Sequence, residues 1–169
     1  MVLLITDYLS VVDRCLKALN HISYHGLGII RKDISTNIAK IDLFRVTNKI
    51  ETIGDGIKME RRHDSSYAKN SFTDAMFWTN HMLDFVWVLV NEQQKGINIK
   101  DAVKTAYTTC LNPFHSSYIS KLVYVGIHVA TVPSNVNHLL TSLPENERNQ
   151  LRNIIDEVYK ELEGWQPKS

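Results

Sequence analysis

The sequence predicts an all-α protein that folds as one domain over residues 1–169, with roughly seven or eight helices. Apolar residues recur at three- and four-residue spacing along most of the chain, which is the period of a helix with one buried face. We find neither an alternating strand pattern of useful length nor an internal repeat. A length of 169 residues is typical of a single domain.

Composition and charge narrow the classes of function. Hydrophobic residues make up 44% of the chain and charged residues 22%, which is ordinary for a globular protein and argues against disorder. A net charge of +1 provides no broad field to attract nucleic acid or a strongly anionic membrane. Cys15 and Cys110 match no paired metal or redox spacing, so we expect reduced thiols in a cytoplasmic protein. We also expect no signal peptide and no membrane-spanning segment, because every apolar run is too short.

The first expected helix covers residues 3–19, and a break follows at residues 20–28. The break contains His21 and His25, which have the i, i+4 spacing of a metal-binding pair. Because no third ligand is spaced with them, we expect no metal site there. The apolar stripe of the helix consists of Leu4, Tyr8, Val11, Val12, Cys15, Leu16 and Leu19.

The second expected helix covers residues 27–46. The segment at 47–62 has isoleucines at helical spacing, but Gly54 and Gly56 weaken the prediction of a helix. Residues 63–70 are polar and predict a loop.

A central helix is expected between Ser71 and Gln94. Ser71 or Thr73 can cap its start, and Asp74 in the first turn favours the positive helix end. Gly96 predicts its end. Apolar residues surround this segment nearly completely, so we expect it to be covered on most sides.

Proline marks the boundaries of the later elements. Pro133 stops one helix, and Pro144 suits the first position of another. The tail from Gly164 onward is not expected to be helical. The expected elements are a helix at 99–111, a break at Asn112-Pro113, a strongly apolar helix at 114–132, a short helix or loop at 135–142 and an amphipathic helix at 145–163.

The second helix carries a line of polar side chains. Asp33, Asn37 and Lys40 stand at i, i+4 and i+7, on one face and over about two turns, on the order of 10 Å. An apolar stripe of isoleucines runs beside them, one residue later. An acid, an amide and an amine in line suit a ligand with many hydroxyl groups. The alternative is a solvated helix face of mixed charge.

Further positions connect this line with a known family. Asp33 to Ile41, as Asp-Ile-x-x-Asn-Ile-x-Lys-Ile, resembles the head-group motif of the glycolipid transfer protein family. Phe77-Trp78 is similar to that family's tryptophan that stacks on the first sugar ring, and Phe114-His115 resembles its Tyr-His pair. Residues 121–133 are similar to its proline-closed helix. The ordered set spans most of the chain.

The resemblance implies a fold and a site. The fold is a two-layer helical sandwich, with lipid chains between the layers and the polar head group in a surface recess. In this chain Asp33 would accept hydrogen bonds from sugar hydroxyls and the amide N–H of a sphingoid base. Asn37 and Lys40 would bind further sugar hydroxyls. Trp78 would stack on a hexose, and His115 would donate to the ceramide carbonyl.

The resemblance implies intermembrane transfer of a single glycosylceramide-type sphingolipid. We expect no cofactor, transient peripheral membrane contact and a monomer. Ceramide-1-phosphate is the alternative ligand, although residues 70–94 hold no Lys or Arg to bind a phosphate. The family's Gly-Trp after the histidine is replaced by Ser116-Ser117, which leaves the membrane-docking surface open. The residues expected to line a hydrophobic pocket are Phe44, Met82, Phe85, Leu89, Ile119 and Leu122.

Two other classes of protein remain as alternatives. A hydrolase could pair Asp33 with His115 and use Ser116 or Ser117 as its nucleophile. The sequence lacks a nucleophile-elbow pattern and any signal of an oxyanion hole, so we expect no enzyme. A sensor that binds the lipid without carrying it would have the same site residues.

Overall fold

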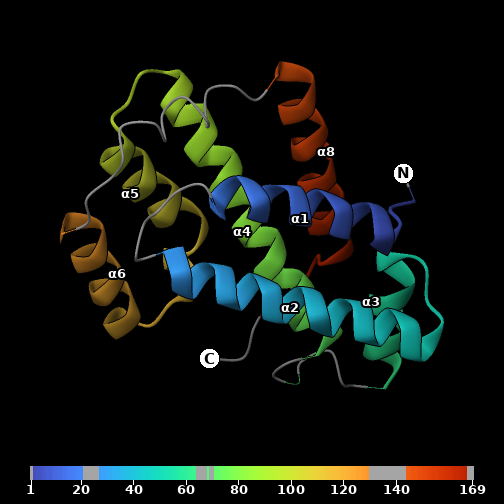
Figure 1. The fold of residues 1–169 in the computed structure, drawn as a ribbon. Coiled ribbons are helices and arrows are strands. Elements are labelled where there is room, and N and C mark those ends of the chain that lie inside the picture. Colours follow the sequence, from blue (N-terminus) through green and yellow to red (C-terminus); the bar gives the residue numbers. More distant parts are fainter. Residues whose placement is uncertain (1, 21–26, 64–67, 69–70, 130–143, 167–169) are drawn as a thin grey trace.

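The computed structural model of the chain is built from helices (Figure 1) and describes residues 2–20, 27–63, 68, 71–129 and 144–166. Within these ranges an isolated bridge between Leu4 and Thr52 is the only β-type pairing. The predicted all-α class is therefore confirmed. The helices are α1 (Ile5–Asn20), α2 (Leu27–Asn48), α3 (Ile53–Arg62), α4 (Phe72–Gln94), α5 (Ile99–Cys110), the 3-10 helix η1 (Asn112–Phe114), α6 (Ser117–Val129) and α8 (Glu145–Glu161).

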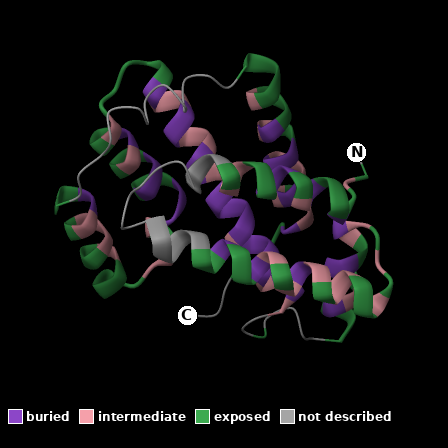
Figure 2. Cartoon of the chain, viewed as in Figure 1, coloured by how far each residue is buried: buried purple, intermediate pink, exposed green. Residues whose placement is uncertain are grey.

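Helix α4 is the centre of the fold. Its start is capped by Ser71, whose hydroxyl oxygen accepts a hydrogen bond from the Asp74 backbone N–H at 3.0 Å. Gly96, just beyond its end, has a φ of +80°, a left-handed conformation that glycine adopts without strain. Helices α1, α2, α3, α5 and α8 all pack against α4. Figure 2 shows α4 buried along most of its length, as its all-round apolar surface predicts.

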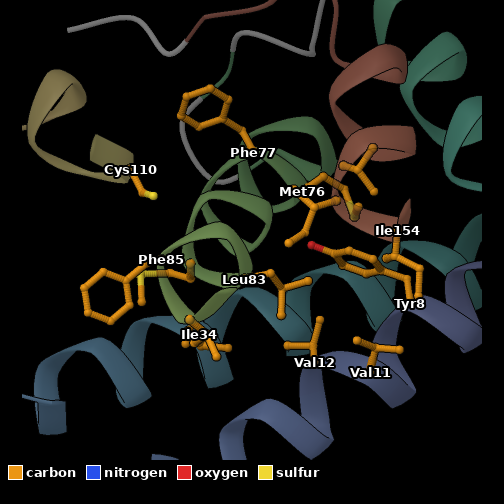
Figure 3. Close-up of a cluster of buried hydrophobic side chains, with 14 of the residues drawn as sticks. Tyr8, Val11, Val12, Ile34, Met76, Phe77, Leu83, Phe85, Cys110 and Ile154 are labelled. Carbon is orange, nitrogen blue, oxygen red and sulfur yellow. The ribbon is translucent and has the colours of Figure 1, made fainter. Parts of the chain in front are cut away.

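The core lies where α1 and α2 cross α4. In Figure 1 these two helices run side by side in front of α4, with α5 on one side of it and α8 on the other. Figure 3 shows Tyr8 and Val12 of α1, together with Ile34 of α2, facing Met76 and Leu83 of α4. All five side chains are at most 4% exposed. The isoleucine stripe of α2 therefore faces inward, and the neighbouring polar line is carried toward the surface.

Helix α3 forms despite its two glycines, and its packing explains one of them. A Cβ atom on Gly56 would lie 2.5 Å from the ring of Phe72, so only glycine allows α3 to approach α4 this closely. The buried Glu60 carboxylate then accepts hydrogen bonds at 2.8 Å from the backbone N–H groups of Phe72 and Thr73. A carboxylate at a helix N-terminus is favourable because the helix dipole is positive there.

Several boundaries differ from the prediction. Helix α6 begins at Ser117 rather than at residue 114, because residues 112–114 form the 3-10 helix and His115 is extended. Pro144 is the residue just before the first turn of α8, rather than the first residue within it. The predicted short segment at 135–142, the histidines of the 20–28 break and most of the 63–70 loop lie outside the described residues. None of the helices in the described ranges combines the length and the hydropathy that a bilayer-spanning segment needs.

Candidate functional site

The polar line predicted on the second helix lies on α2. Asp33 is exposed, Lys40 is half-buried, and Asn37 is 9% exposed. Lys40 Nζ donates a hydrogen bond to Asn37 Oδ1 at 3.3 Å. Since Lys40 uses the amide oxygen, the amide N–H₂ group of Asn37 is the part that can donate to a ligand at this face.

Trp78 and His115 come together although 37 positions separate them in the chain. Trp78 is half-buried on α4, and His115 follows the 3-10 helix. Their rings are stacked, with centroids 5.7 Å apart and planes at 26°. The break at Asn112-Pro113 has a structural purpose here, because it ends α5 and returns the chain to α4 at His115.

Asp33 lies near enough to His115 to influence its titration. Burial lowers the pKa of His115 from its usual value, and the Asp33 carboxylate opposes this by raising it. The imidazole is therefore neutral at pH 7. The structure thus brings Asp33 of α2, Trp78 of α4 and His115 into one neighbourhood, with the Asn37–Lys40 pair farther along the same face of α2.

His115 has a partner that sequence reasoning missed. The hydroxyl of Tyr107, on α5, is 2.9 Å from His115 Nδ1. Tyr107 is 2% exposed, and in the sequence its inward position marks it only as an apolar core residue. The one available signal was that a buried tyrosine hydroxyl generally requires a hydrogen-bond partner.

An aromatic cluster centred on Phe77 packs against Trp78 and supports the site. The Phe77 ring meets Trp78 edge-on at 5.4 Å and Phe114 edge-on at 5.0 Å between centroids. Trp165, from the C-terminal tail, lies 5.0 Å from Phe77 and is 5% exposed. Trp165 had no predicted role. Its contact shows that the tail, although not helical, supports the helix turn that carries Trp78.

A polar network joins this cluster to α8. The Tyr159 hydroxyl lies 2.9 Å from His81 Nδ1 and donates to Asp84 Oδ2 at 3.0 Å. Arg152 Nη1 binds the other oxygen of Asp84 at 2.9 Å. Burial lowers the pKa of His81 to about 4, and a hydrogen bond to the Cys110 backbone partly opposes that shift. Because His81 is neutral at pH 7, its ring packs against Phe114 at 4.4 Å without burying a charge.

The residues predicted to line a hydrophobic pocket are in two different environments. Met82, Phe85 and Leu89 are buried in the core on α4, and Phe44 is half-buried and stacks on Phe72 at 4.7 Å. Ile119 and Leu122 lie on the outer face of α6, 40% and 52% exposed. The structure therefore does not bring the six together. No group of three or more metal-ligating side chains is found among the described residues.

Comparison with known proteins bears directly on this geometry. The sequence matches the profile of the glycolipid transfer protein (GLTP) family over residues 3–145. The chain belongs to this family. Members of the GLTP family are lipid transfer proteins rather than enzymes. No curated protein sequence matches the chain significantly.

Solved structures share the GLTP fold with this chain. The fungal glycolipid transfer protein HET-C2 is 13% identical, with a TM-score of 0.77 over 99% of this chain and 89% of its own. The GLTP-fold structure of FAPP2, described as selecting simple glycosphingolipids, is 18% identical, with a TM-score of 0.74 over 96% of this chain and 81% of its own. The human ceramide-1-phosphate transfer protein, solved with its lipid, is 12% identical, with a TM-score of 0.74 over 95% of this chain and 84% of its own. These structural matches show the fold, a two-layer helical sandwich of the GLTP type.

Proposed function

We propose that this GLTP-family protein transfers a single glycosylceramide-type sphingolipid between membranes. The sugar head group would occupy the surface between α2 and the Trp78–His115 pair, and the hydrocarbon chains would enter between the helix layers. The observation that carries the proposal is the stacking of His115 on Trp78, with the Asp33 carboxylate of α2 near enough to act on the charge of the imidazole. We infer a cytoplasmic monomer that contacts membranes transiently.

Each group has a role that matches its chemistry. The carboxylate of the exposed Asp33 accepts hydrogen bonds from sugar hydroxyls and from the lipid amide N–H. The amide of Asn37 and the ammonium group of Lys40 donate to further hydroxyls. The Trp78 face that His115 does not cover stacks on the hexose ring, and His115 donates to the amide carbonyl. No bond of the lipid is broken.

The energetics of lipid binding indicate that these polar groups determine which lipid is bound. Burying hydrocarbon from water is worth about 0.8 kcal/mol per methylene. A lipid that leaves a bilayer for an apolar protein interior gains little of this energy, because its chains are already out of water. Contacts to the head group and the amide therefore decide which lipid is bound.

Neutral sugar is favoured over phosphate by the residues on α4. This helix contains no Lys or Arg, and an aromatic side chain stands where the head group would lie. A phosphate group is bound best by paired cations, arginine above all. Ceramide-1-phosphate remains the second candidate, because the human protein solved with that lipid shares this fold. A sensor that binds the lipid without releasing it to a second membrane is the third.

Helix α6 provides the surface that we propose for membrane contact. Four of its five exposed apolar side chains, at i, i+4, i+7 and i+11, lie along one face. The helix begins two residues after His115, so a bilayer on this face would lie beside the head-group site. A lipid surface fits this face because the lipid cargo starts and ends in one. The face consists of Tyr118, Leu122, Val125 and Val129.

Native mass spectrometry tests the proposal. The protein is incubated with phosphatidylcholine vesicles that contain equal amounts of glucosylceramide, galactosylceramide and ceramide-1-phosphate, and is then separated from them. We expect a one-to-one complex with a glycosylceramide. A complex with ceramide-1-phosphate alone would establish the second candidate, and the absence of any sphingolipid complex would contradict both.

A further inference from the structure

The contact between Tyr107 and His115 involves one particular nitrogen of the histidine ring, Nδ1. Their atoms Oη and Nδ1 are 2.9 Å apart, within normal hydrogen-bond range. Tyr107 is held firmly, because it is 2% exposed on α5 and its ring meets Tyr124 edge-on at 5.4 Å. The hydroxyl therefore reaches His115 from a fixed position.

The direction of this hydrogen bond follows from the chemistry of its two partners. The phenol is the stronger acid of the two, and an imidazole nitrogen is the better acceptor. In the favourable arrangement the Tyr107 hydroxyl donates to Nδ1 of His115. Burial raises the pKa of Tyr107, so the phenol keeps the proton that it donates.

A neutral imidazole has one donor and one acceptor. If Nδ1 accepts from Tyr107, then Nε2 carries the hydrogen. The stacked Trp78 ring restrains the plane of the histidine, so its free edge has a defined direction. A ring fixed in this way presents a single N–H donor.

We propose that Tyr107 is a positioning residue that holds His115 as the Nε2–H tautomer, so that Nε2 donates to the amide carbonyl of the bound sphingolipid. The role of the carbonyl rests on the proposed function. The tautomer itself is a property of the lipid-free protein. In the other tautomer Nε2 would be an acceptor facing an acceptor, and the hydrogen bond to the lipid would be lost.

The tautomer can be measured without lipid by nitrogen-15 NMR of the His115 ring. We expect a protonated Nε2 and an unprotonated Nδ1 in the wild-type protein near pH 7.5. Tyr107→Phe should produce a mixture of tautomers and raise the pKa of His115, because the hydroxyl stabilises the neutral ring. The control is Tyr124→Phe, which removes a neighbouring hydroxyl that bonds to Thr108 at 2.8 Å. It should leave both His115 signals unchanged.

Lipid binding supplies the second readout. Tyr107→Phe should weaken binding to glucosylceramide vesicles by roughly threefold to tenfold, as expected for one hydrogen bond. In a His115→Gln background the same substitution should cause no further loss, because the two residues act as a unit. Tyr124→Phe should bind like the wild type.

The two readouts separate this inference from the proposed function. An Nδ1–H tautomer in the wild type, or a tautomer that Tyr107→Phe does not change, overturns the positioning role. If Tyr107→Phe does not fold, an Nδ1–H tautomer in the wild-type spectrum still overturns the role. Failure of the wild type to bind any sphingolipid contradicts the proposed function and the lipid-facing role of Nε2, whatever the tautomer is.

Discussion

At the residue scale, the side chains of the site are each held in place by a neighbouring side chain. His115 is stacked on Trp78 and hydrogen-bonded to Tyr107. Trp78 in turn lies against Phe77, which packs on Trp165 from the tail. Binding groups held in this way keep their geometry before the ligand arrives, which lowers the entropic cost of binding.

Trp78→Ala tests the stacking contact. Loss of one aromatic contact is expected to cost about 0.5–1.5 kcal/mol, so glucosylceramide binding should weaken severalfold. Tryptophan-fluorescence titration with vesicles would measure the change. Trp87→Ala is a matched control on the same helix, nine residues away or about 13 Å along its axis. Equal losses in the two variants would contradict a specific role for Trp78.

Some of these residues were predictable and others were not. Asp33, Asn37 and Lys40 could be placed on one face because a helical period fixes the relation between neighbours on one element. The Tyr107–His115 bond could not be predicted, because the direction of the chain after Pro113 depends on tertiary packing. The sequence also did not show which side of α6 is buried. Ile119 and Leu122 were expected inside and lie outside, because a segment apolar on all sides does not reveal which side is covered.

At the element scale, the contact between α3 and α4 shows how a poor helix former can be required. Gly56 allows the ring of Phe72 to lie against the backbone of α3. That approach also places the Glu60 carboxylate at the first N–H groups of α4. From sequence alone the glycines were signs of weakness, because helix propensity contains no information about what packs against a position.

Substitution at the two glycines of α3 should affect the free energy of unfolding differently. Gly56→Ala should destabilise the fold by about 1–3 kcal/mol, because the new methyl group overlaps the buried Phe72 ring. Gly54→Ala meets only the flexible end of Glu161, so the higher helix propensity of alanine should leave stability unchanged or raise it by up to about 1 kcal/mol. Urea unfolding of both variants checks this. A Gly56→Ala variant as stable as Gly54→Ala would refute the close approach.

The exposed face of α6 leads to a separate prediction about membrane docking. Leu122→Glu places a charge on a side chain that is 52% exposed, so the fold should be retained. Transfer should slow by roughly threefold or more, because an apolar contact with the bilayer is replaced by a charge. Thr105→Glu, at an exposed position on α5, is the control. Vesicle co-sedimentation would show whether the change is in docking, and unaltered docking would exclude this face.

At the scale of the whole molecule, neutral histidines make the fold sensitive to acid. Burial lowers the pKa of His81 to about 4, whereas in the unfolded chain the value is near 6.5. Between these two pH values the unfolded state binds a proton that the folded state does not. Stability therefore falls as the pH falls through this window, and it is fully retained above about pH 6.5.

Urea unfolding at pH 7 and pH 4.5 should reveal this loss. We expect at most about 2–3 kcal/mol from His81, with His115 contributing in the same direction because its pKa is also lowered. His81→Gln should reduce the difference in unfolding free energy between the two pH values, whatever its stability at pH 7. His63→Gln, at an exposed position, should leave the difference as in the wild type. The same pH difference in His81→Gln and wild type would rule out His81 as the cause.

The central claim is that a single site binds a sphingolipid with a neutral sugar head group. Lipid transfer between vesicles tests this claim most directly. Fluorescent glucosylceramide and ceramide-1-phosphate would be followed in parallel with wild-type protein, Asp33→Val and, as a control at the adjacent exposed position, Lys32→Val. We predict transfer of glucosylceramide by the wild type and Lys32→Val, its loss in Asp33→Val, and unchanged circular dichroism in both variants. Transfer of ceramide-1-phosphate alone, or glucosylceramide transfer that Asp33→Val leaves intact, would contradict the claim.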